Sequence, residues 1–113
     1  SDDGGAKVPP ALLEEVFALN EELDEIRELR ESGGDAGTLR ARLDAARTPI
    51  ERKRDEHERR IRELGDRWDS EADSPPGERL TTLGALREQL LERKYIDNLL
   101  ATIDREAAGL GVS

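Results

Sequence analysis

The sequence of 113 residues contains no cysteine and a single histidine, His57. The absence of cysteine excludes disulfide bonds, cysteine nucleophiles and thiolate ligands for a metal or cluster, and it is typical of a reducing compartment. One histidine with scattered carboxylates provides neither a zinc site nor a nucleophile with an oriented base. The glycine-rich loops that bind phosphates are also missing. We therefore expect no catalytic residue, no metal, no cofactor and no enzyme activity.

Long apolar segments are absent too. No stretch approaches the ~18 consecutive apolar residues of a membrane span, and the first residues lack the basic and apolar regions of a signal peptide. Aromatic residues make up only 3% of the chain. These features predict a cytoplasmic protein with no membrane partner.

Charged residues are abundant, at 40% of the chain with a net charge of -9. Alanine, glutamate, lysine, arginine and leucine together account for 62 of the 113 residues, a composition typical of long helices. The arginines between Arg47 and Arg67 alternate with carboxylates. Because this interleaving and the net charge both oppose binding to a polyanion, we expect no nucleic acid partner.

Heptad spacing of apolar residues predicts three helices, at about 11–31, 38–69 and 78–109. The first carries Leu12, Val16, Leu19, Leu23 and Ile26. The second carries Leu39, Leu43, Ala46, Ile50, Lys53, His57, Ile61, Leu64 and Trp68. The third carries Leu80, Leu83, Leu86, Leu90, Ile96, Leu100, Ile103, Ala107 and Leu110, with a register slip between Leu90 and Ile96. On this pattern His57 is a packed core residue.

Glycine and proline mark the boundaries. Ser32-Gly33-Gly34 ends the first helix, and we expect Thr38 to cap the second. Ser74 is expected to cap the third, before Pro75 and Pro76. Pro49 lies inside the second helix, where proline removes one backbone donor and predicts a kink or break near Ala45, and we expect a single kinked helix.

Three amphipathic helices with short turns predict an all-α fold, an elongated antiparallel three-helix bundle formed by residues 11–110. The second and third helices would each be about 48 Å long and the first about 30 Å long. Residues 1–10 resemble a linker or a remnant of an expression vector, and residues 111–113 a tail.

A second surface is expected on the first helix. Leu13 and Phe17 lie about 100° and 140° from Leu12 around the helix, next to a run of carboxylates that includes Glu21 and Glu25. Either the third helix buries the two apolar side chains, or a partner covers them. Tyr95 also lies off its helix seam and would join them if the third helix ran antiparallel beside the first, although it can equally be a boundary tyrosine.

Charge is concentrated on the same helix. Residues 11–31 hold eight acidic and two basic side chains, net -6, whereas residues 38–70 are net +2 and residues 78–110 net -1. An acidic rim beside an apolar centre favours a protein partner with a basic rim.

Two segments resemble a known family. The segment 12–26, LLEEVFALNEELDEI, is similar to the first helix of the C-terminal domain of HscB-type co-chaperones, and 94–99, KYIDNL, is similar to the aromatic segment of that family's last helix. The resemblance implies a three-helix domain that binds an iron–sulfur cluster scaffold protein. It also implies delivery to a DnaK-class chaperone through a J-domain, whose His-Pro-Asp signature this chain lacks.

By position, the resemblance assigns partner binding to Leu13, Phe17, Glu21, Glu25 and Tyr95. We therefore expect the substrate-binding half of an HscB-like co-chaperone. The alternative is a generic coiled-coil adaptor or oligomerisation domain that forms homo-oligomers.

Overall fold

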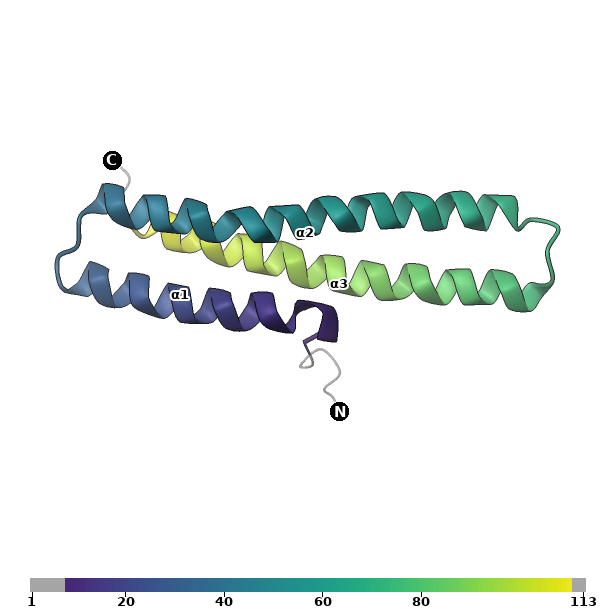
Figure 1. Cartoon of the computed structure of the whole chain (residues 1–113), viewed down its shortest axis with the longest axis horizontal. Coiled ribbons are helices and arrows are strands. Elements are labelled where there is room, and N and C mark those ends of the chain that lie inside the picture. The colour runs from purple at the N-terminus through teal and green to yellow at the C-terminus, as the bar shows by residue number, and fades with distance from the viewer. Residues whose placement is uncertain (1–7, 111–113) are drawn as a thin grey trace.

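The computed structural model describes residues 8–110, which form three long helices and no strand (Figure 1). A 3₁₀ turn, η2 (Pro10–Leu12), leads into α1 (Leu13–Glu31), and α2 (Ala36–Ser70) and α3 (Pro76–Ala108) follow. The predicted all-α three-helix bundle is confirmed. Residues 1–7 and 111–113, expected as most of a linker and as a tail, lie outside the described residues. Val8, which we had placed in the linker, packs against the core.

Successive helices run antiparallel, so α1 and α3 run in the same direction (Figure 1). The expectation that the third helix could run antiparallel beside the first is wrong, because two reversals of direction separate them. The described chain measures 62 × 30 × 22 Å. α2 and α3 form the long hairpin, and α1 lies along only one half of it (Figure 1). We call the half without α1, residues 57–91, the distal hairpin.

The hydrophobic core lies where all three helices meet. Leu12, Leu19, Leu23 and Ile26 are buried at the centre of the first seam, as their spacing predicted. They pack with Leu39, Leu43 and Ile50 of α2 and with Ile96, Leu100 and Ile103 of α3. Full burial of one such side chain contributes about 1.5–3 kcal/mol, so this cluster holds α1 on the hairpin.

The turn between α1 and α2 is built from glycine and an aspartate cap. Gly33 has a φ of 88°, the left-handed conformation that glycine adopts without strain. The Gly34 amide donates to the Leu29 carbonyl at 2.7 Å. Asp35, rather than the expected Thr38, caps α2: its Oδ2 accepts from the Thr38 amide at 3.0 Å. Asp35, three residues before Thr38, therefore caps the helix, which starts at Ala36.

Proline lies at two of the predicted helix features. α2 continues unbroken through Pro49, so the second helix is a single helix, as expected. At the start of α3 the N-cap is Pro75 and no side chain makes a cap hydrogen bond, so the expected cap by Ser74 is wrong. Pro76 occupies the first helical position, where its missing amide hydrogen would have no partner in any case.

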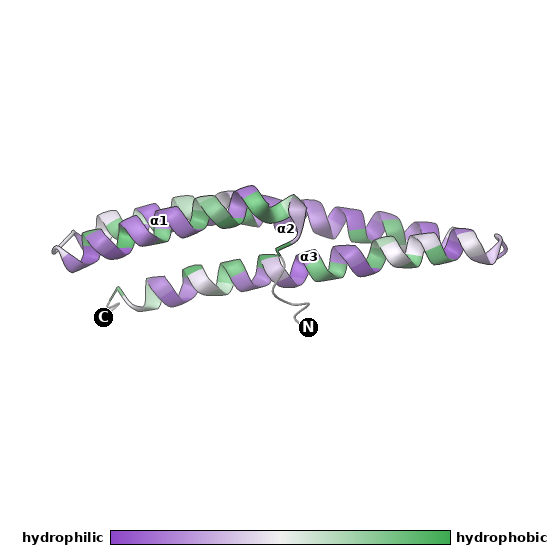
Figure 2. Cartoon of the chain, turned by 90° about the horizontal axis from the view of Figure 1, so that it is seen from below, coloured by the Kyte–Doolittle hydropathy of each residue, from purple (hydrophilic) through white to green (hydrophobic). Residues whose placement is uncertain are grey.

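The seam of α3 differs from the prediction in the distal hairpin. Leu80 and Leu90, expected in the core, are 64% and 56% exposed. The residues that face α2 are instead Thr82, Gln89, Ile96 and Ile103, each seven residues from the next and each buried or half-buried. A row with constant heptad spacing needs no register slip. Figure 2 shows hydrophobic positions continuing along α3 beyond the end of α1.

The α2 seam agrees with the prediction over its whole length, since all nine of its residues are buried or half-buried. His57 is among the buried ones, and its Nε2 lies 2.9 Å from Glu92 Oε1 of α3. The expected role of His57 as a packed core residue is therefore confirmed. Its contact with Glu92 joins the two helices of the hairpin.

Candidate protein-binding surface

The entry to α1 separates two neighbouring leucines. The 3₁₀ turn places Leu12 in the core, where it is fully buried, and the α-helix begins at the next residue. Leu13 is 40% exposed and Phe17, one helical turn later, is 63% exposed. No segment of residues 8–110 seals these side chains inside the fold, as the expectation that α3 buries them would require. Two apolar groups one turn apart on one helix face are suited to contact a partner.

Carboxylates extend this surface along α1. Glu21 is exposed and has no hydrogen bond or ion pair within residues 8–110. Glu25 is also exposed, but its Oε1 accepts from Arg42 Nη2 at 2.9 Å. The two predicted acidic residues therefore differ: the Glu21 carboxylate is available to a partner, whereas the Glu25 carboxylate already contacts a cation of α2.

Arg42 fixes the orientation of α1 against α2. Its Nε donates to Glu22 Oε2 at 2.8 Å and its Nη2 to Glu22 Oε1 at 2.6 Å, a bidentate pair. These hydrogen bonds to Glu22, with a further one to Glu25, raise the pKa of Arg42 above its ordinary value. The pair sets the rotation of α1, and with it the direction of Leu13 and Phe17.

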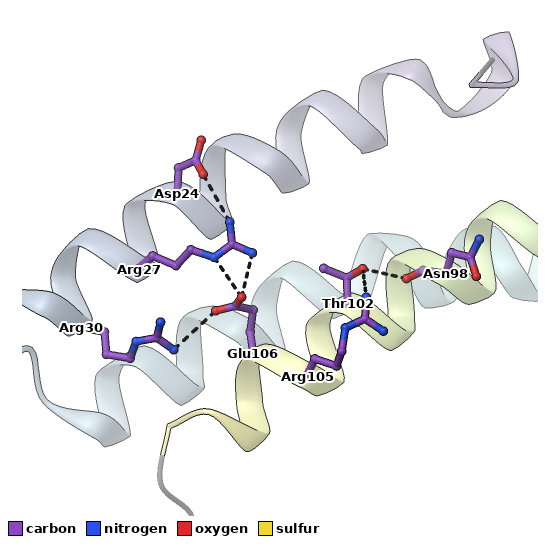
Figure 3. Close-up of polar contacts among 7 residues, drawn as sticks. All are labelled: Asp24, Arg27, Arg30, Asn98, Thr102, Arg105 and Glu106. Atoms are coloured by element: carbon purple, nitrogen blue, oxygen red, sulfur yellow. Dashed lines mark hydrogen bonds and ion pairs between the residues drawn. The ribbon is translucent and has the colours of Figure 1, made fainter. Parts of the chain in front are cut away.

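A second ion pair fixes α1 against α3 (Figure 3). Arg27 Nε donates to Glu106 Oε2 at 2.9 Å, and this hydrogen bond raises the pKa of Arg27. Arg30 Nη1 lies 3.6 Å from the other oxygen of the same carboxylate. Glu106 therefore marks the side of α3 that faces α1.

This ion pair also fixes the level of Tyr95. Phe17 precedes Arg27 by ten residues and Tyr95 precedes Glu106 by eleven, and the two helices run parallel. Eleven residues at about 100° each return to within about 20° of the starting direction, so Tyr95 lies on the α1-facing side of α3 at the level of Phe17. Tyr95 is half-buried and packs against the core. We call Leu13, Phe17, Glu21, Glu25 and Tyr95 the α1 surface.

An open groove of about 450 Å³ lies between α1 and α2, on the other flank of α1. Sequence reasoning did not identify it, because it results from small side chains on two helices that only the fold brings together. It is lined by Glu14, Glu15, Ala18, Leu19 and Glu22 of α1 and by Ala45, Ala46, Pro49 and Ile50 of α2. Lys53 lies beside it, with Nζ 3.7 Å from Glu15 Oε2. Its lining contains no nucleophile and no histidine.

Within residues 8–110 no group of three or more histidine, cysteine, aspartate or glutamate side chains could hold a metal ion. Among the same residues, no helix carries an apolar stretch sufficient to cross a bilayer. No protein-family model, no curated protein and no solved structure matches the chain.

Proposed function

We propose that this domain is a protein-binding module that recognises an iron–sulfur cluster scaffold protein through the α1 surface. The observation that carries the proposal is the exposure of Leu13 and Phe17 on the acidic helix, at the level that the Arg27–Glu106 ion pair gives to Tyr95 on α3. The likeness of segments 12–26 and 94–99 to HscB-type co-chaperones selects the scaffold as the partner. In this proposal the domain acts in the cytoplasm and has no chemistry of its own.

The composition of the α1 surface fits such a role. An apolar centre supplies most of the affinity of a protein interface, while surrounding charge sets the association rate and the orientation. Residues 11–31 are net -6. The scaffold surface that docks here therefore carries an apolar pocket surrounded by lysine or arginine. Delivery to a DnaK-class chaperone requires a J-domain, which residues 1–113 do not contain.

The test is a pull-down with the purified domain, with the bound proteins identified by mass spectrometry and then titrated individually by calorimetry. Saturable one-to-one binding of a cluster scaffold protein supports the proposal. If a purified scaffold protein shows no binding heat at micromolar concentrations, the proposal is wrong.

A second candidate function is a coiled-coil adaptor or oligomerisation domain. A different observation favours it: Leu80, Leu90 and Leu91 of the distal hairpin are each more than half exposed. Sedimentation velocity over a range of concentrations distinguishes self-association from a monomer. If the protein is a monomer at every concentration, it is not an oligomerisation domain, and the adaptor role is the one that remains.

A further inference from the structure

The outer side of α3, in the distal hairpin and the helical turn that follows it, carries a row of residues with heptad spacing. Leu80, Leu83, Arg87, Leu90 and Lys94 follow one another at intervals of three and four residues, and Leu91 lies beside them. Leu80 and Leu91 are each 64% exposed, Arg87, Leu90 and Lys94 are exposed as well, and Leu83 is half-buried. We call these six residues the α3 stripe. It is separate from the seam of Thr82, Gln89 and Ile96 that packs on α2.

The chain's own α1 does not cover the α3 stripe. Glu106 marks the α1 side of α3, and Asp104, two residues earlier, points about 160° away, where it contacts Arg47 of α2 at 2.6 Å. Leu83 and Leu90 precede Asp104 by three heptads and two heptads, so they share its direction. Figure 1 also shows that α1 ends before the distal hairpin.

The spacing and the charge of the stripe select its occupant. Apolar residues at heptad spacing on one helix form the seam that accepts another amphipathic helix. Arg87 and Lys94 have no ion pair within residues 8–110, whereas Arg93 contacts Asp97 and Arg79 lies 3.8 Å from the Trp68 ring. Two unpaired cations inside an apolar row are best matched by carboxylates on the occupant.

A second copy of the same stripe does not fit. In an antiparallel pairing centred on the stripe, Arg87 faces Arg87 of the other copy. In a parallel pairing, both Arg87 and Lys94 face their own counterparts. Like charges placed opposite each other in a seam are destabilising. We therefore propose that the α3 stripe binds an amphipathic helix of another protein that carries leucine-type residues flanked by glutamate or aspartate.

The test uses the whole 113-residue chain and two labelled three-heptad peptides. One peptide has leucine at the first and fourth positions of each heptad with glutamate beside them, and the other has lysine in place of glutamate. Fluorescence anisotropy at low salt should show saturable binding of the glutamate peptide and binding at least about tenfold weaker for the lysine peptide. Equal affinity for the two peptides, or no binding of the glutamate peptide, overturns the proposal.

Variants locate the binding to the stripe. The double substitution Arg87→Glu and Lys94→Glu should weaken binding of the glutamate peptide by at least about tenfold, because two attractive contacts become repulsive. Leu90→Ser should weaken it as well. The matched control is Arg52→Glu with Arg59→Glu, two exposed cations of α2 that are also seven residues apart and have no ion pair within residues 8–110. Unchanged affinity in the first double variant, or an equal loss in the control, contradicts the assignment.

Two further results would overturn this proposal. One is self-association of the free protein that Leu90→Ser abolishes, which assigns the stripe to a second copy. The other is retention on phosphatidylserine vesicles without peptide binding, which assigns it to a lipid surface. Phe17→Ser should leave peptide affinity unchanged, because Phe17 belongs to the α1 surface. A failure of the peptide to bind the α3 stripe can therefore be distinguished from a failure of the scaffold protein to bind the α1 surface.

Discussion

Leu12 and Leu13 are adjacent in the sequence but lie in opposite environments. The Leu12 side chain is fully buried in the three-helix core, whereas Leu13 is 40% exposed. The change from the 3₁₀ turn to the α-helix falls between them. One leucine therefore anchors α1, and the other is available to a partner.

This difference predicts unequal effects on stability. Leu12→Ala should lower the free energy of unfolding by about 2–5 kcal/mol, because it leaves a cavity in the core. Leu13→Ala should lower it by less, by about 1 kcal/mol, because a substantial part of the Leu13 side chain already contacts water in the folded protein. Urea denaturation followed by circular dichroism measures both. Equal losses would contradict the separation of core and surface.

Asp35 is predicted to stabilise the start of α2. Asp35→Ala removes the acceptor for the Thr38 amide and should cost about 1 kcal/mol of stability. Thr38→Val is the control, since it keeps the cap at the Thr38 amide while removing the hydroxyl contact with Asp35. An equal loss in the two variants would show that the hydroxyl, and not the amide, is the group whose contact with Asp35 stabilises the helix.

Pro49 is predicted to destabilise the helix that contains it. Proline removes a backbone hydrogen bond from the helix interior, at a cost of up to about 3 kcal/mol relative to alanine. Since α2 is continuous and Pro49 is exposed, Pro49→Ala should raise the free energy of unfolding by about 1–3 kcal/mol. A rise in the thermal unfolding midpoint would confirm this. A fall would mean that the ring makes packing contacts in the α1–α2 groove that outweigh the lost hydrogen bond.

Glu21 is predicted to accelerate scaffold association. Glu21→Lys should slow association several-fold at low salt, and the difference should shrink as ions screen the surface. Glu21 is a cleaner choice than Glu25, whose carboxylate also contacts Arg42. Glu56→Lys, an equal charge change at an exposed position of α2, is the control. Stopped-flow rates that fall equally for both variants would indicate a net-charge effect without a localised acidic rim.

The sequence predicted the parts of the fold that depend on local periodicity. The α1 seam from Leu12 to Ile26 and the α2 seam through His57 are regular, and burial follows them. The helix caps were less predictable, because Asp35 and Thr38 are both good cap residues and only the path of the turn decides between them. Pro49 shows that a helix held by packing on both sides of a proline can continue through it.

The α3 register failed for a physical reason. Leucine was taken as the mark of the core, but the seam on α2 uses Thr82 and Gln89, while Leu80 and Leu90 belong to another side of the helix. A two-helix hairpin buries only one narrow seam per helix, so apolar residues exceed the buried positions there. Heptad counting backwards from Ile103 would have found the seam, since Ile96, Gln89 and Thr82 follow at intervals of seven.

The candidate site was predictable in part. Angles around α1 placed Leu13 and Phe17 outside the core, and the structure agrees. The position of Tyr95 required the register of α3 against α1, which the sequence did not fix. The ion pair of Arg27 with Glu106, between residues 79 apart, supplies the level that places Tyr95 at the height of Phe17 along the bundle.

The central claim is tested most directly by calorimetric titration of a cluster scaffold protein with two single variants of this chain, Phe17→Ala and Leu80→Ala. The two side chains are equally exposed, at 63% and 64%, but lie on different surfaces of the molecule. The account predicts that Phe17→Ala weakens binding by ~2 kcal/mol or more, as expected for a central anchor, while Leu80→Ala leaves it unchanged. Unchanged affinity in Phe17→Ala, or an equal loss in both variants, would contradict the assignment of scaffold binding to the α1 surface.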